Sequence, residues 1–152
     1  MTHTFLFQQG TWNVAGYYTD AEGQKNPIKG SARIVHQDRQ WQLSGLIAIL
    51  SDPPITIEND LTFEPVSPGG LHTRWKSENH SFGPLEGMIV VVDDSILSTF
   101  ESGDGIHKGM ECFRKLTNTH YTNRGALFSG NTRVSSWIVE LHLSGTISHQ
   151  MI

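Results

Sequence analysis

Turn-forming residues interrupt this chain so often that its apolar runs seldom exceed the length of a β-strand. Clusters rich in Gly, Pro, Asp, Asn and Ser lie at residues 20–23, 52–54, 67–70, 103–105 and 129–131. These residue types accept positive φ angles or cap their own backbone, which favours tight turns. No run between them keeps the three-to-four residue spacing of an amphipathic helix. The sequence therefore predicts about ten strands, at residues 11–18, 30–36, 40–50, 55–63, 71–77, 86–92, 96–101, 106–116, 120–128 and 133–143.

Two of these runs alternate apolar and polar residues with a period of two. The apolar positions of the first are Ile55, Ile57, Leu61 and Phe63. Those of the last run are Trp137, Val139, Leu141 and Leu143, opposite a polar row that only Ile138 interrupts. Because successive side chains of a strand point to opposite faces, each run has one face to bury and one for solvent.

Short connections between successive strands favour a single antiparallel up-and-down β-barrel of about 8–10 strands with little helix. Neighbours joined by short turns pair antiparallel, and closing the sheet removes the unpaired edges that would promote aggregation. A hydrophobic content of 37% suits a wall whose outer face meets water. We expect one barrel domain over residues 1–145 and a flexible tail over 146–152. A barrel of this size fills its interior with side chains or holds one small ligand.

Charge and composition exclude several classes of partner. The net charge is −4, with 11 basic and 15 acidic residues spread along the chain, so no basic patch is available for nucleic acid. No apolar stretch is long enough for a membrane span or a signal peptide, which predicts a cytoplasmic protein. A single cysteine, Cys112, excludes an intramolecular disulfide and a cysteine-based zinc cluster. The sequence leaves open whether the chain is a monomer or a homodimer.

The tripeptide Gly10-Thr11-Trp12 opens the first strand, and together with the strand meander it resembles the calycin superfamily. That group includes lipocalins, fatty-acid-binding proteins and the nitrobindin-like haem barrels. The resemblance implies that Trp12 is structural and plugs one barrel end beneath a basic side chain from the final strand. Arg133, at the start of the last run, and Arg124, one run earlier, are the candidates for that basic side chain. It also implies an open-mouthed barrel that binds a small apolar or amphipathic molecule without a covalent bond.

The run 71–77 supplies the clearest candidates for lining such a cavity. One register turns Thr73, Trp75 and Ser77 inward and leaves the basic residues of the run in water. The opposite register turns Arg74 inward, where its guanidinium would clamp a ligand carboxylate. Aromatic and apolar side chains commonly line ligand cavities. The predicted ligand-binding residues are Thr73, Trp75, Ser77, Glu111, Arg124, Trp137 and Leu141.

The run 106–116 has no cleanly apolar face, so the orientation of Glu111 is ambiguous. Met110 shares one face with Lys108 and Arg114, and Glu111 lies on the other. A solvated Glu111 is a surface charge, whereas an inward Glu111 orients a polar ligand group or, if desolvation raises its pKa, acts as an acid or base. No catalytic motif is present, and we predict no catalytic residue. A small isomerase or lyase that uses an inward Glu or Arg, and a regulatory protein acting through its outer face, remain alternatives.

Eight histidines are present, but none forms a close sequence pair with metal-ligand spacing. The sequence therefore gives little support to a zinc site. His142 lies on the polar row of the last strand, and nitrobindin-like proteins take their haem-ligating histidine from near the C-terminus. The resemblance thus implies haem binding through His142 as an alternative to an unidentified small ligand. In the other interpretation, His142 is an ordinary exposed strand residue.

Overall fold

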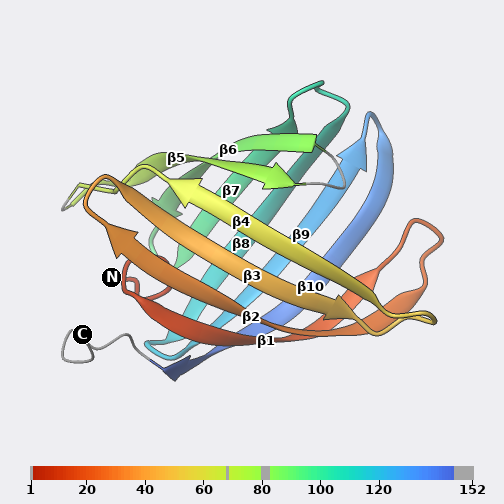
Figure 1. Cartoon of the computed structure of the whole chain (residues 1–152), viewed down its shortest axis with the longest axis horizontal. Coiled ribbons are helices and arrows are strands. Elements are labelled where there is room, and N and C mark those ends of the chain that lie inside the picture. The colour runs from red at the N-terminus through yellow and green to blue at the C-terminus, as the bar shows by residue number, and fades with distance from the viewer. Residues whose placement is uncertain (1, 68, 80–82, 146–152) are drawn as a thin grey trace.

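The computed structural model describes residues 2–67, 69–79 and 83–145, and these residues form a closed antiparallel barrel of ten strands (Figure 1). The strands are β1 (Gly10–Thr19), β2 (Lys25–Gln37), β3 (Gln40–Ile49), β4 (Ile55–Phe63), β5 (His72–Asn79), β6 (Gly83–Val92), β7 (Ser95–Ser102), β8 (His107–Thr117), β9 (His120–Ser129) and β10 (Thr132–Gly145).

Each strand pairs with its neighbours in the chain, and β10 closes the ring by pairing with β1. The predicted fold class, an all-β up-and-down barrel, is therefore confirmed. The proposed division into a barrel domain over 1–145 and a tail over 146–152 stays a prediction, because the tail lies outside the described residues. Within the described part of the chain, no helix is long and apolar enough to cross a membrane.

The strand boundaries agree with the sequence prediction to within a few residues, except at β2. The predicted run begins at Gly30, beyond Pro27, which is a poor strand residue. The strand itself begins at Lys25, since β1 lies alongside it over its whole first half. Pro27 has no N–H group, but its carbonyl still accepts a hydrogen bond from the Leu50 amide at 2.8 Å. Pairing with β1 thus outweighs the local preference of these residues.

Residues 3–6, which precede the first strand, close the barrel at the end where β1 begins and β10 ends (Figure 1). Phe5 is 1% exposed and stacks on Phe113, with ring centroids 4.8 Å apart. Trp12, also 1% exposed, meets the rings of Phe5 and Tyr121 edge-on at 5.4 and 5.6 Å. The predicted burial of Trp12 is confirmed. We refer to residues 3–6 as the N-terminal plug.

Hydrogen bonds fix the N-terminal plug to the barrel wall. The Tyr121 hydroxyl accepts a bond from the Thr4 amide at 3.1 Å and lies 2.7 Å from His3 Nδ1. Thr4 Oγ1 donates to the Asn118 carbonyl at 2.7 Å. Burial raises the pKa of Tyr121, while the bonds from Thr4 oppose that rise. The sequence analysis did not anticipate this plug, because its residues carry no periodic pattern.

The expected basic cover over Trp12 is not formed by either candidate arginine. Arg133 lies opposite Phe128, whereas Trp12 lies opposite Leu143 at the other end of β10. The Arg133 guanidinium instead donates to the Asp20 carbonyl at 2.8 Å. Arg124 is exposed on the outer face of β9. The prediction of an arginine over Trp12 is therefore wrong, and the N-terminal plug covers this ring instead.

Candidate functional site

The barrel places most of the predicted ligand-binding residues on its inner face. β5 turns Thr73, Trp75 and Ser77 inward. The register with Arg74 inside is therefore wrong, because Arg74 is exposed on the outer face. These residues lie on the opposite side of the ring from Trp137, since β5 and β10 are five strands apart.

The remaining members of the predicted set divide between the two faces. Glu111, Trp137 and Leu141 point inward from β8 and β10, and Leu141 is 3% exposed near the plugged end. Arg124 points to solvent, so it cannot contact a ligand inside the barrel. Arg124 therefore does not belong to an interior ligand-binding set. The register of β9 turns the neighbouring Asn123 inward instead.

Trp75 reaches across one strand of the inner wall. Its ring lies over Gly87, where an added Cβ would come within 2.5 Å of the indole. Beyond this glycine, Trp75 Nε1 donates to Ser98 Oγ on β7 at 3.2 Å. The glycine therefore allows the indole to lie flat against the wall and reach a strand that β5 does not pair with.

Trp137 on β10 is arranged in the same way as Trp75, with its ring over a glycine of the neighbouring strand. Its ring lies over Gly125 on β9, where an added Cβ would come within 2.3 Å of the indole. Trp137 Nε1 donates to Asn123 Oδ1 at 2.9 Å and, more weakly, to Glu111 Oε1 at 3.3 Å. The two indoles thus extend toward each other along the inner wall, each across a glycine.

Ser98 and Glu111 join these two arrangements. They are direct partners across β7 and β8, so their side chains are neighbours on the inner face. We call the continuous set Trp75, Ser98, Glu111, Asn123 and Trp137 the inner polar belt. The sequence analysis did not identify Ser98 or Asn123. The sequence signal that could have pointed to this region is the pair of glycines within strands, Gly87 and Gly125. A glycine in a strand marks a position where another group approaches closely.

Glu111 is the electrostatic centre of the inner polar belt. Burial raises its pKa from 4.5 to about 7, while hydrogen bonds from Asn123 and Trp137 oppose the rise. The lysines and arginines of the chain are exposed, except Lys115 and Arg133, which bind backbone carbonyls at the two ends of the barrel. The described part of the interior therefore offers ionised Glu111 no lysine or arginine partner.

The inner face also keeps surface that its own side chains do not cover. Trp137 and Phe100 point inward near the middle of their strands and yet are only half-buried, as is Glu111. Ser77 Oγ is buried without a hydrogen-bond partner, whereas Thr73 Oγ1 donates to the Glu64 carbonyl at 2.7 Å. Buried polar atoms without a partner are rare in native proteins, and a bound ligand is one way to satisfy them.

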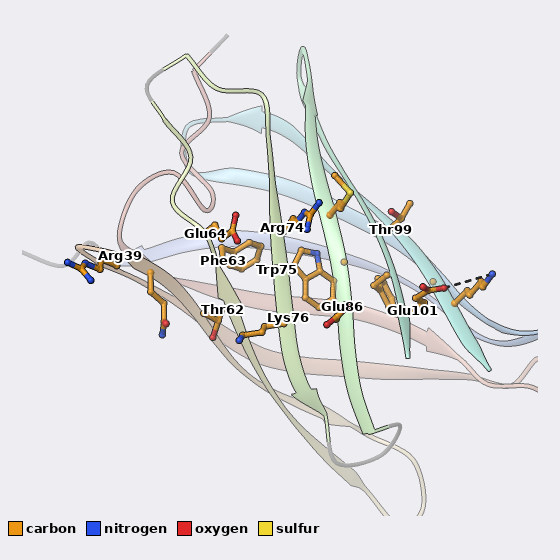
Figure 2. Close-up of a pocket in the computed structure, with 16 residues that line it drawn as sticks. Arg39, Thr62, Phe63, Glu64, Arg74, Trp75, Lys76, Glu86, Thr99 and Glu101 are labelled. Carbon is orange, nitrogen blue, oxygen red and sulfur yellow. Dashed lines mark ion pairs between the residues drawn. The ribbon is translucent and has the colours of Figure 1, made fainter. Parts of the chain in front are cut away.

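A separate hollow of about 770 Å³ lies on the outer face of β4–β8 (Figure 2). Its charged side chains carry both signs: Arg39, Glu64, Arg74, Lys76, Glu86, Glu101 and Lys108. Trp75 contributes to the floor of this hollow, because the wall of which it is part lies between the hollow and the inner polar belt. The inner polar belt is the stronger candidate, since it contains the Glu111 carboxyl with its raised pKa, and the unpartnered Ser77 hydroxyl lies on the same face.

His142 lies on the outer face of β10 and is exposed. Its ring stacks on His120 of β9, with centroids 4.1 Å apart. This exposure agrees with the polar row on which the sequence placed His142, and haem binding through His142 stays a prediction. The sequence contains no close pair of histidines with metal-ligand spacing, but the pairing of β9 with β10 brings these two histidines together in space.

Comparison with known proteins adds evidence on the fold. No protein-family model matches this chain, and no curated protein sequence matches it significantly. The S-type phycobiliprotein lyase CPES from Guillardia theta superposes with a TM-score of 0.67 at 7% sequence identity, over 91% of this chain and 89% of that one. The two chains share a fold. A fluorescence-activating β-barrel designed de novo aligns over 95% of this chain and 100% of its own length, at a TM-score of 0.48 and 13% identity.

Proposed function

We propose that this chain binds one small amphipathic molecule inside the barrel. The inner polar belt carries the proposal, because it sets an inward-facing carboxyl group, Glu111, between two indole rings. The ligand's apolar part packs against Trp75 and Trp137, and its polar group meets Glu111. The Ser77 hydroxyl, which has no partner in the protein, supplies a further contact. Apolar and aromatic walls with a few placed polar groups are typical of small-molecule sites.

The charge of the interior limits the polar group of the ligand. A carboxylate would meet ionised Glu111 without an interior lysine or arginine to compensate either charge. An amine or a hydroxyl, by contrast, donates a hydrogen bond to this carboxylate. We therefore propose that the ligand carries an amine or another hydrogen-bond donor. This differs from the carboxylate clamp that an inward arginine would have provided.

The fold is compatible with this function. The structural neighbour with the higher TM-score is a phycobiliprotein lyase, so a natural protein with this fold acts on another molecule. At 7% identity the likeness supports a common barrel and no common substrate. We also propose that the barrel is calycin-like, on the grounds of its meander topology and the buried Trp12 at one end.

General acid–base catalysis is the second candidate function, and the pKa of Glu111 is the observation that favours it. A carboxyl group with a pKa of about 7 exchanges its proton readily near neutral pH, as a general acid or base must. Glu111→Gln would abolish turnover of an isomerase or lyase substrate while leaving that substrate bound. Binding without turnover in the unmodified protein would leave the first proposal in place and contradict this one.

The ligand class is tested with matched probes. Tag-free protein is first examined by native mass spectrometry for a co-purified molecule. It is then titrated with octylamine, octanol and octanoate, above the pKa of Glu111, while tryptophan fluorescence is recorded. We expect octylamine to bind best, at about one per chain, and Glu111→Gln to weaken it by about tenfold, which corresponds to about 1.4 kcal/mol.

A pair of adjacent substitutions controls for the location of binding. Trp75→Ala removes an inner-face ring and should weaken octylamine, whereas Lys76→Ala changes the outer face and should not. Circular dichroism checks that both variants keep the barrel. Preferential binding of octanoate would overturn the proposed ligand class. No binding of any probe, or equal effects of the two substitutions, would overturn binding in the interior.

A further inference from the structure

Three side chains with metal-binding atoms lie together on the outer face of β9 and β10. His120 and His142 are direct cross-strand partners. Glu140 lies two residues before His142 on the same face, and its Oε1 is 3.1 Å from His120 Nε2. One ligand atom from each of the three side chains lies within 4.8 Å of the others. This cluster is separate from the inner polar belt, because the barrel wall lies between them.

The backbone holds these side chains in a fixed relationship. β9 and β10 are each paired on both sides, with β8 and β1 respectively, so neither strand can move away from the other. Directly opposite residues of an antiparallel pair keep their Cβ atoms about 4.5–5.5 Å apart. Bringing the three ligand atoms onto one ion therefore requires side-chain rotation only. The side chains are accessible for this, with 25% of His120 and 58% of Glu140 exposed.

The donor set determines which ions fit. Two imidazole nitrogens and one carboxylate oxygen form the set that Zn²⁺ uses in three-ligand sites, where water takes the fourth position. Ca²⁺ and Mg²⁺ prefer oxygen ligands and would gain little from the two histidines. In the absence of a metal, the bond between His120 and Glu140 keeps two of the ligands together.

We propose that His120, Glu140 and His142 bind one divalent transition-metal ion, with Zn²⁺ the best match to the donor set. The ion links β9 to β10 on the outer face. His120 directly precedes Tyr121, whose hydroxyl holds the N-terminal plug from the inner face. The ion binds the folded barrel and not the unfolded chain, so it stabilises this end of the molecule. The free energy of unfolding then rises with the logarithm of the free metal concentration.

Isothermal titration of tag-free, metal-free protein with Zn²⁺ tests the proposal. We expect one ion per chain, and a melting temperature that rises with Zn²⁺ but not with Mg²⁺. His120→Ala and His142→Ala should each weaken binding by at least about tenfold. His72→Ala is the matched control, because it removes an exposed outer-face imidazole from β5. It should leave the affinity unchanged.

Cu²⁺ provides a direct view of the ligands. Electron paramagnetic resonance of the protein with one equivalent of Cu²⁺ should show nitrogen hyperfine splitting from two imidazoles, and His142→Ala should reduce this to one. Circular dichroism verifies that each variant remains folded. Absence of Zn²⁺ binding would overturn the proposal. So would Zn²⁺ binding that His72→Ala weakens as much as His120→Ala does, because the ion would then bind surface histidines without a defined site.

Discussion

Glu111→Gln replaces an inward-facing, half-buried carboxyl group by an uncharged group of nearly the same shape. Burial raises the pKa of Glu111 from its ordinary value of 4.5 to about 7. Between these values the folded chain holds a proton that the unfolded chain has released, so the free energy of unfolding falls as the pH rises. This contribution is fully present below pH 4.5 and is lost as the pH passes through about 7. Glutamine does not titrate, so the variant lacks this fall in the free energy of unfolding.

The size of the effect follows from the two pKa values of Glu111. Each unit of pKa corresponds to about 1.4 kcal/mol, so the full interval corresponds to roughly 3 kcal/mol. The side chain is only half-buried, and water that reaches it inside the barrel lowers this figure. We therefore expect Glu111→Gln to raise the free energy of unfolding above pH 7 by about 1–3 kcal/mol relative to its effect below pH 4.5.

Urea unfolding followed by tryptophan fluorescence measures this difference at a series of pH values. Other groups titrate over the same range, but their contributions cancel when the variant is compared with the unmodified chain at each pH. Glu101→Gln is the control, because this carboxylate is 58% exposed beside Lys108 on the outer face. Its effect should stay within about 0.5 kcal/mol at every pH. A Glu111→Gln effect that does not change with pH would refute the reasoning.

Three substitutions test the packing of the barrel. Trp12→Ala should lower the free energy of unfolding by about 3–5 kcal/mol in urea titrations, and a near-zero effect would show that the N-terminal plug does not depend on this ring. Tyr121→Phe removes the hydroxyl that anchors the plug and should cost about 1–3 kcal/mol, with faster hydrogen exchange in residues 3–6. Unchanged exchange there would contradict the anchoring role. Gly125→Ala should displace the Trp137 indole, shift its fluorescence and cost about 1–3 kcal/mol, whereas Gly103→Ala, where an added Cβ has its nearest neighbour at 3.9 Å, should do neither.

The inner polar belt shows where prediction from the sequence stopped. Period-two alternation correctly placed Trp75 and Trp137 on the inner face. It did not decide the orientation of Glu111, because both faces of residues 106–116 carry charged side chains. Pairing of Glu111 with Ser98 on one side and Gly125 on the other decides it. Buried polar groups break the apolar pattern on which sequence reasoning depends, so a functional site is the least predictable part of such a strand.

The sequence by itself determined the number of strands, their approximate limits and, in the strands with clear alternation, which residues point inward. These features are local, because they follow from turn-forming residues and from the two-residue period of an extended chain. The tertiary structure decided which side chains meet. The approach of Trp75 to Ser98, the pairing of His120 with His142 and the closure of one end by the N-terminal plug join residues that are distant in the chain. Such contacts depend on strand register and on closure of the ring, and no local pattern encodes either.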